Sequence, residues 1–377
     1  MIKILHTADW QIGKLFGQFE PDDAAILADA RFTTVERLCR LASENAVDVF
    51  LVAGDVFDAQ GVADKTIHRL FNCLAAFKGP CVLIPGNHDA ALAESVWTRA
   101  ARLNAIPSNA HICLSSEPLI LQALGLVILP APLTQRHTHT DLTEWFASAQ
   151  VSTSMFRIGL AHGSVQGILA EGIDSSNPIA ARRAEQSGLD YLALGDWHGT
   201  KQVDERTWYS GTPETDRFRA NDSGQALLVE LHAPGALPSV TPVTTGQFRW
   251  HSNTVDLQVP SDVDALLHRL KGLTQTDVFQ LNVSGQIDLA CHRRLDEAIG
   301  QANGRARTLL CDLSELRFEP TSEDIAALNA DGYLGEVISE LRTAQNGPAA
   351  GVAKDSLALL AGLLDERKAK ATAGGSL

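Results

Sequence analysis

Acidic, amide and imidazole side chains follow five apolar segments of the chain, at the points where those segments end. In order, they are D-W-Q from Asp9, G-D-V-F-D from Gly54, G-N-H-D from Gly86, H-G from His162 and G-D-W-H-G from Gly195. Carboxylate, amide and imidazole groups are the ones that proteins use to hold divalent metal ions. The five groups therefore predict one polar site for metal chemistry, provided that the fold brings them together.

The spacing within these groups fits that chemistry. Residues two apart in extended chain point to the same side, so Asp9 and Gln11 can face one ion together, as can Asp196 and His198. The carboxylate of Asp55 has two oxygens and can bridge two cations. Taken singly, each group has an ordinary explanation as a turn, a strand end or a core histidine. Their ordered conjunction favours a site.

Alternating strand and helix patterns supply the elements that position these groups. Seven apolar, β-rich runs predict strands: Ile2–His6, Val49–Ala53, Cys81–Ile84, Leu126–Leu129, Phe156–Ala161, Tyr191–Leu194 and Ala226–Leu231. Helical patterns lie between them, for example at Ala24–Ser43 and Ala63–Ala76. This is an α/β arrangement, in which ligand groups gather at the carboxyl ends of strands.

Composition changes along the chain predict three parts. The first, residues 1–245, ends in a Pro- and Thr-rich strand and linker at His232–Thr245. Residues 250–320 predict a small α/β domain, from these elements in order: strand Thr254–Val259, helix Val263–Lys271, strand Phe279–Ser284, helix Arg293–Gln301 and strand Thr308–Asp312. Residues 325–377 predict a helical tail. Its two apolar stripes are Leu334, Val337, Ile338 and Leu341, then Leu357, Leu360, Leu363 and Leu364.

Net charge and cysteine content restrict the kind of partner and the cellular compartment that we expect. The net charge of the 377-residue chain is -14, from 31 basic and 45 acidic residues. The negative charge argues against a protein that binds nucleic acid over a wide surface, although a metal ion or a partner protein can supply positive charge. None of the six cysteines is spaced C-x-x-C, and no signal peptide or membrane-spanning run is evident. We expect a cytoplasmic protein with free thiols and no membrane contact.

The motifs HTADWQIG, VAGDVFD, IPGNHD, LAHG and ALGDWHG resemble those of the calcineurin-like metallophosphoesterases. Within that family, they look most like the SbcD-type exonucleases, the bacterial members of the Mre-eleven DNA-repair nuclease family. The resemblance implies a four-layer β-sandwich flanked by helices, followed by a small α/β capping domain and a helical C-terminal tail.

Carried over position by position, the resemblance implies two divalent metal ions. The first would be held by Asp9, Gln11, Asp55 and His198, and the second by Asp55, Asn87, His162 and Asp196. His88 would contact the scissile phosphate and help to protonate the leaving oxygen. Asp58 and Asp89 would orient the ligands.

Two positions depart from the family pattern, because Gln11 and Asp196 stand where the family usually has histidine. Both changes replace a nitrogen ligand by an oxygen one, so Mn²⁺, or else Mg²⁺, should suit the site better than Zn²⁺. Partial decay of the site, with loss of one metal, is the alternative that these two residues leave open.

The activity implied is metal-dependent hydrolysis of phosphodiester bonds in DNA, in a DNA-repair exonuclease or endonuclease subunit. By the same resemblance, the chain would form a homodimer, and its tail would dock an SMC-like ATPase subunit (SbcC-like). Two other functions remain open. One is a phosphatase or cyclic-nucleotide phosphodiesterase acting on small molecules, and the other is a catalytically weakened scaffold that binds DNA ends.

Overall fold

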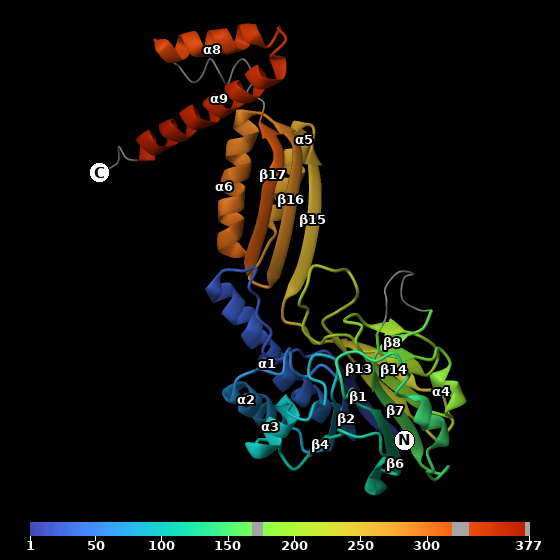
Figure 1. The fold of residues 1–377 in the computed structure, drawn as a ribbon. Helices are drawn as coiled ribbons and strands as arrows, with labels where there is room; N and C mark the ends of the chain where they lie inside the picture. The colour runs from blue at the N-terminus through green and yellow to red at the C-terminus, as the bar shows by residue number, and fades with distance from the viewer. Residues whose placement is uncertain (168–175, 319–331, 374–377) are drawn as a thin grey trace. The chain divides into compact units, whose positions relative to one another are not determined.

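The computed structural model describes residues 1–167, 176–318 and 332–373, and the chain divides into two compact units after Arg249 (Figure 1). The first unit contains two six-stranded sheets. One sheet has the order β14-β13-β1-β2-β3-β4, with β1 Ile2–Thr7, β2 Val49–Ala53, β3 Cys81–Ile84, β4 Ala110–Ile112, β13 Gln225–Leu231 and β14 Ser239–Thr244. The other has the order β11-β12-β10-β7-β6-β5, with β5 Leu119–Leu121, β6 Leu126–Ala131, β7 Phe156–His162, β10 Tyr191–Gly195, β11 Lys201–Gln202 and β12 Thr207–Tyr209.

The central strands of both sheets are buried on both faces, which explains their continuous apolar sequences. Ile4 and Leu51 of the first sheet share a core between the sheets with Ile128 and Ile158 of the second. The pairs β1–β2 and β2–β3, and also β6–β7 and β7–β10, are parallel. Their carboxyl ends therefore lie at one edge of each sheet, which is where the predicted site residues follow.

Helices cover the outer face of the first sheet. These are α1 Pro21–Glu44, α2 Asp64–Leu74 and α3 Val96–Arg102, which Figure 1 shows gathered beside β1, β2 and β4. Helix α1 begins three residues before the predicted Ala24, because Pro21 suits the first helical turn and Asp22 adds an acidic group there. The outer face of the second sheet is covered by the short η2 (Glu144–Ser148) and α4 (Arg183–Gln186). The predicted four-layer α/β sandwich is confirmed.

The segment after β13 belongs to the first sheet. Strand β14 pairs antiparallel with β13 and forms the sheet's edge. Pro242 is tolerated there because an edge strand has backbone groups that need no partner strand. The shorter elements of this unit are η1 Gln122–Leu124, β8 Ser164–Val165 and β9 Pro178–Ile179.

His6, the next-to-last residue of β1, links the two sheets. Its Nδ1 lies 2.9 Å from the hydroxyl of Tyr191, and its Nε2 lies 3.2 Å from the carbonyl oxygen of Leu194, both on β10. The side chain is fully buried, and burial lowers its pKa from 6.5 to about 3. His6 is therefore neutral in the folded chain at pH values where the unfolded chain protonates it.

This pKa difference predicts a loss of stability in mild acid. Below pH 6.5 the unfolded chain binds a proton at His6 and the folded chain does not, so the free energy of unfolding falls as pH falls. We expect the stability advantage of the native chain over His6→Gln to shrink by about 2 kcal/mol between pH 7 and pH 5. Urea unfolding of both proteins across this range measures the difference. A difference that does not change with pH would contradict a neutral, buried His6.

The second unit begins with a small α/β domain. Its sheet has the order β15-β16-β17, with β15 Arg249–Leu257, β16 Asp277–Ile287 and β17 Thr308–Phe318. Helices α5 (Pro260–Lys271) and α6 (Leu289–Arg305) pack on it through a core that includes Leu266, Leu281 and Leu295. Helix α6 begins four residues before the predicted Arg293, because the carboxylate of Asp288 accepts a hydrogen bond from the backbone N–H of Cys291 at 2.7 Å.

Two helices follow in the tail, α8 Tyr333–Ala344 and α9 Ala350–Ala373. Their apolar stripes pack on each other, with Ile338 and Leu357 buried at the contact. Helix α9 also packs on Leu289 of α6 through Ala361. Residues 325–331 and 374–377 of the predicted tail lie outside the described residues. Across the described parts of the chain, no helix combines the length and the hydrophobicity needed to cross a membrane.

Candidate metal centre

The strand ends converge in the first unit. The loops after β1 and β2 continue the pairing of their strands: the backbone N–H of Asp9 donates to the carbonyl of Gly54 at 3.0 Å, and that of Gln11 donates to the carbonyl of Asp55 at 2.9 Å. His162 is the last residue of β7 and pairs with Gly195, the last residue of β10. The two sheets thus bring the polar residues of both to one place.

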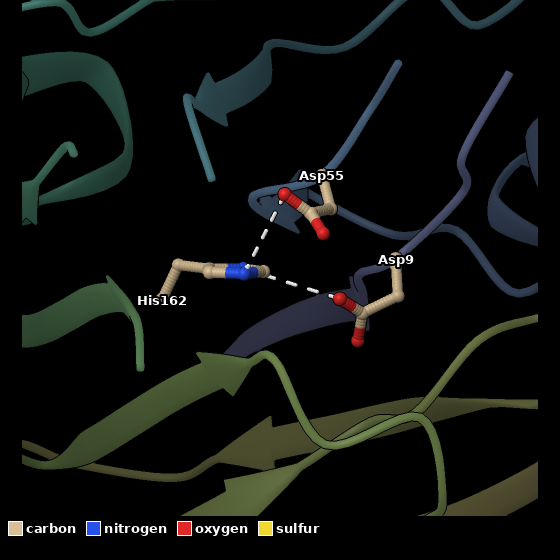
Figure 2. A group of neighbouring side chains, drawn as sticks. All are labelled: Asp9, Asp55 and His162. Carbon is tan, nitrogen blue, oxygen red and sulfur yellow. Dashed lines mark ion pairs between the residues drawn. The ribbon is translucent and has the colours of Figure 1, made fainter. Parts of the chain in front are cut away.

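Asp9, Asp55 and His162 form the centre of this site (Figure 2). One potential ligand atom from each lies within 4.8 Å of the other two. His162 Nε2 is 3.6 Å from an oxygen of Asp55, and its Nδ1 is 4.0 Å from an oxygen of Asp9. All three side chains are buried, with exposed fractions of at most 3%. This spacing is right for groups that surround one ion.

Two more predicted residues join the centre. Asn87 Oδ1 lies 2.9 Å from His162 Nε2, and Asp196 Oδ1 lies 3.8 Å from the same nitrogen. The backbone N–H of Asp196 donates to the carboxylate of Asp9 at 3.2 Å. His162 Nδ1 donates to the carbonyl of Ala53 at 2.8 Å, which leaves Nε2 facing the other groups. We call Asp9, Asp55, Asn87, His162 and Asp196 the His162 set.

Buried carboxylates perturb one another in this set. Burial, together with the neighbouring carboxylates of Asp55 and Asp196, raises the pKa of Asp9 to about 6 against the opposing effect of His198 and His162. Burial also raises the pKa of Asp196. Burial alone would lower the pKa of His162, but three surrounding carboxylates outweigh it and raise the pKa to about 9. Such crowding of negative charge is stabilised by a bound cation.

The backbone at the centre adopts an uncommon conformation. The φ angles of Asp9, Gln11, Asp55 and Asp196 are 54°, 43°, 50° and 99°, all in the left-handed region that side chains other than glycine rarely adopt. Residues held in this region cluster at functional sites, where the surrounding structure offsets the strain. Four of the seven predicted metal ligands share this property.

Glycines make room for the ligands. A Cβ atom at Gly54, where φ is 89°, would lie 2.3 Å from Nδ1 of His162. At Gly86 it would lie 2.2 Å from Oδ1 of Asp55. Any side chain at either position would therefore displace a predicted ligand.

His88 stands beside the His162 set. Its backbone N–H donates to Asp55 at 2.9 Å, and its Nδ1 donates to the backbone carbonyl of Asp58 at 2.8 Å. Its Nε2 lies 4.0 Å from the other oxygen of Asp55, and 31% of the side chain is exposed. Asp58 therefore orients His88 through its main chain. The second ring nitrogen of His88 is available to a substrate.

Asp89 contacts the backbone of two loops that carry the predicted ligands. Its carboxylate accepts hydrogen bonds from the backbone N–H groups of Gly86 at 2.7 Å and Phe57 at 3.0 Å. It thereby ties the loop after β3 to the loop after β2. Burial, together with the charge of Asp55, raises the pKa of Asp89 to about 7.

Gln11 and His198, two further predicted ligands, lie close to each other. Gln11 Nε2 is 3.2 Å from His198 Nε2, and Gln11 Oε1 accepts a hydrogen bond from Lys14 Nζ at 3.2 Å. Nη2 of Arg217 lies 2.9 Å from Nδ1 and 3.3 Å from Nε2 of His198. These two predicted ligands are thus held in a network of protein hydrogen bonds.

Sequence reasoning missed the residues that complete this network. Asp216, 1% exposed, pairs with Lys14, Arg31 and Arg217 at 2.5, 3.1 and 2.9 Å, and its Oδ1 is 3.5 Å from His198. Burial would raise its pKa, but His198, Arg31 and Arg217 lower it well below its usual range. The segment P-E-T-D-R-F after β12 carries two acidic residues and a basic one, which is the sequence signal that could have drawn attention to this cluster.

Residues 2–229 match the family model described as calcineurin-like phosphoesterase. The chain belongs to this family. The phosphoesterase is also similar to the crystal structure of TT1561 of Thermus thermophilus, with 13% identity over 65% of this chain and 99% of that one, and a TM-score of 0.40. A second solved structure is 12% identical over 64% of this chain and 98% of its own, with a TM-score of 0.42.

Family membership makes the chain a metal-dependent phosphoester hydrolase. The His162 set fits a divalent ion on this structure's own geometry. It offers three carboxylates, one amide oxygen and one imidazole nitrogen, and burial together with the charge of Asp55 raises the pKa of Asp9 and of Asp196, which a bound cation would offset. Donors of this oxygen-rich kind suit Mn²⁺ and Mg²⁺.

Proposed function

We propose that the phosphoesterase hydrolyses phosphodiester bonds in DNA, as an SbcD-type nuclease subunit. The observation that carries the proposal is the buried Asp9–Asp55–His162 cluster with His88 beside it, at the carboxyl ends of strands from both sheets. The resemblance of its motifs to those of the SbcD-type enzymes supports DNA as the substrate. The second unit, which extends the chain beyond the phosphoesterase domain, agrees with that organisation.

Cations around the centre favour a polyanionic substrate despite the net charge of -14. Arg217 is 43% exposed beside His198. Trp197, between the predicted ligands Asp196 and His198, carries the guanidinium of Arg219 at 4.8 Å and the ammonium group of Lys201 at 5.5 Å from its ring centre. These groups can meet phosphates on either side of a scissile bond.

A bound divalent ion supplies Lewis acidity and lowers the pKa of a water molecule. The residues of this chain supply the remaining requirements. The carboxylates of Asp9 and Asp55 and the Nε2 atom of His162 would hold the cation. His88, oriented by the carbonyl of Asp58, can hold a proton on Nε2 and deliver it to the leaving oxygen. Mn²⁺ is the ion that we expect to support the highest rate.

Hydrolysis of end-labelled duplex DNA in Mn²⁺ and in Mg²⁺ tests this function. A para-nitrophenyl phosphate monoester and a cyclic nucleotide should be assayed beside it, with the purified Asp55→Asn variant as a control for contaminating nucleases. The proposal requires DNA to be the preferred substrate. Preference for either small ester would instead identify a small-molecule phosphatase or phosphodiesterase. Metal binding without hydrolysis of any of them would identify a DNA-end-binding scaffold.

We also propose a homodimer and an SMC-like ATPase partner, both by family resemblance. The tail offers a feature that fits a partner. Leu359 and Leu363 of α9 are 70% and 57% exposed, whereas Leu357 and Ala361 on the same helix are buried. A helix that is apolar on both its packed and its exposed sides is suited to contact a second protein.

Truncation before α8, at Gly332, should spare hydrolysis of short DNA but abolish capture of the SMC-like ATPase. Because truncation also uncovers Leu289, the double change Leu359→Glu and Leu363→Glu is the cleaner variant. It should abolish capture without loss of folding, while Thr343→Glu on the exposed face of α8 should leave capture intact. A pull-down with the purified ATPase provides the measurement. Undiminished capture by the Leu359 and Leu363 variant would remove the docking role.

A further inference from the structure

Gln11 and His198, the two residues predicted for the first metal alone, already have hydrogen-bond partners in the protein. The only ligating atom of Gln11 is Oε1, and it accepts a hydrogen bond from the ammonium group of Lys14 at 3.2 Å. The other end of Gln11 is an amide nitrogen, which has no lone pair for a metal and lies 3.2 Å from Nε2 of His198. The family's usual histidine would instead present a ring nitrogen at this position.

Positive charge stands beside the same residues. Lys14 is held in place by Asp216 at 2.5 Å, and Arg217 is held by that carboxylate at 2.9 Å. Arg31 pairs with it as well, at 3.1 Å. Three basic side chains therefore share one carboxylate, so this cluster carries an excess of basic groups. A divalent ion bound to Gln11 and His198 would be repelled by Lys14 and Arg217.

Asp196, the other residue that departs from the family pattern, adds negative charge to the site. Asp196 adds a carboxylate to the His162 set, 3.8 Å from His162 Nε2. The set thus contains three carboxylates, from Asp9, Asp55 and Asp196, where the family pattern would supply two. One metal position has gained negative charge, and at the other the histidine is replaced by an amide whose oxygen already accepts a hydrogen bond from Lys14. The two departures from the family pattern therefore complement each other.

We infer that this phosphoesterase binds one divalent ion, in the His162 set, and that Lys14 and Arg217 replace the second ion. Lys14 donates to the amide oxygen of Gln11 at 3.2 Å, and Arg217 lies 2.9 Å from His198 with 43% of its side chain exposed. A guanidinium can contact two oxygens of a phosphate and stabilise charge that develops on them. Arg217 thereby becomes a residue that touches the substrate.

Metal stoichiometry tests the inference without any assay of activity. Full-length protein is titrated with Mn²⁺, bound metal is counted by native mass spectrometry, and the bound ions are examined by electron paramagnetic resonance. The expected result is one Mn²⁺ per chain with the spectrum of an isolated ion. Two ions per chain at saturation, or the spectrum of a magnetically coupled pair, would overturn the inference, and so would the absence of binding.

The double variant Gln11→His and Lys14→Met tests the cause. It restores a nitrogen ligand and removes one positive charge, so a second Mn²⁺ should bind roughly tenfold or more tightly than to the native chain. Lys65→Met, at an exposed position on α2, is the matched control and should keep one ion. Thermal unfolding followed by circular dichroism establishes that each variant is folded. A folded double variant with unchanged binding would contradict the role given to Lys14.

The role of Arg217 rests on the proposed phosphodiesterase function and has its own readout. Arg217→Met should keep one bound Mn²⁺ while raising KM or lowering kcat on bis(para-nitrophenyl) phosphate, and Arg217→Lys should recover part of the loss. Full activity in Arg217→Met would exclude contact with the phosphate. If the native chain binds one ion but cleaves no DNA, the DNA assignment fails while the metal count stands.

Discussion

Replacement of Asp55 by Ala should leave the phosphoesterase without tightly bound metal and lower hydrolysis by on the order of 10³-fold or more, the scale of losing a Lewis acid. Asp55 is 3.6 Å from Nε2 of His162 through one oxygen, and the same oxygen accepts the backbone N–H of His88. It thus connects the metal position to the candidate acid. Metal content by mass spectrometry and rates on a phosphodiester measure both effects.

Asp55→Asn separates the charge of Asp55 from its structural role. Asparagine tolerates the left-handed backbone at this position, where φ is 50°, and its side-chain oxygen can still accept from His88. This variant should fold like the native chain and still lose metal affinity and activity. Asp29→Asn, at an exposed position on α1, is the matched control. Retention of metal and of the native rate in a folded Asp55→Asn variant would show that Asp55 is not a ligand.

The strands and their polar ends were predictable because two local signals coincide. Runs such as Val49–Ala53 and Cys81–Ile84 are apolar throughout, as strands covered on both faces must be, and the chain can expose a carboxylate only after they end. The apolar sequences of the strands do not indicate which of the two sheets each strand joins. Ile4 and Ile158 have similar neighbours in sequence, yet they lie in different sheets that face each other across one core.

The Asp216 cluster could not be predicted from the sequence. Lys14 and Asp216 are separated by 202 positions, and Arg31 lies on a helix whose pattern predicts only an amphipathic surface. Local periodicity carries no information on which distant carboxylate will receive a lysine. Glu214, two residues earlier, is also buried and accepts the hydroxyl of Thr34 at 2.6 Å and the backbone N–H of Gln247 at 2.7 Å. The segment after β12 is therefore fixed to α1 by contacts that only the folded chain reveals.

The predicted role of Asp58 illustrates the same limit. The spacing in G-D-V-F-D suggests two carboxylates working together, but the contact that orients His88 comes from the main-chain carbonyl of Asp58. The position of Asp58 in this motif therefore corresponds to a role of its main-chain carbonyl and not of its carboxylate. Asp58→Ala should accordingly cost far less activity than a change at His88.

His88→Ala should fold, keep its metal, and lose roughly 10²–10⁴-fold in hydrolysis of DNA if the imidazole protonates the leaving oxygen. The Nδ1–H bond to the carbonyl of Asp58 fixes the ring, and Nε2 lies 4.0 Å from Asp55, at the edge of the metal position. His68→Ala, an exposed histidine on α2, is the matched control and should have the native rate. Native activity in His88→Ala would contradict any catalytic role.

The leaving group distinguishes the two ways in which His88 can act. An alkoxide that leaves from DNA needs a proton, whereas para-nitrophenolate leaves readily without one. If His88 is a general acid, the loss in His88→Ala should be large on DNA and small on bis(para-nitrophenyl) phosphate, and the variant should lose the alkaline limb of the pH–rate profile on DNA. Equal losses on both substrates would instead assign His88 to electrostatic contact with the phosphate, because that contact stabilises the transition state whatever group departs.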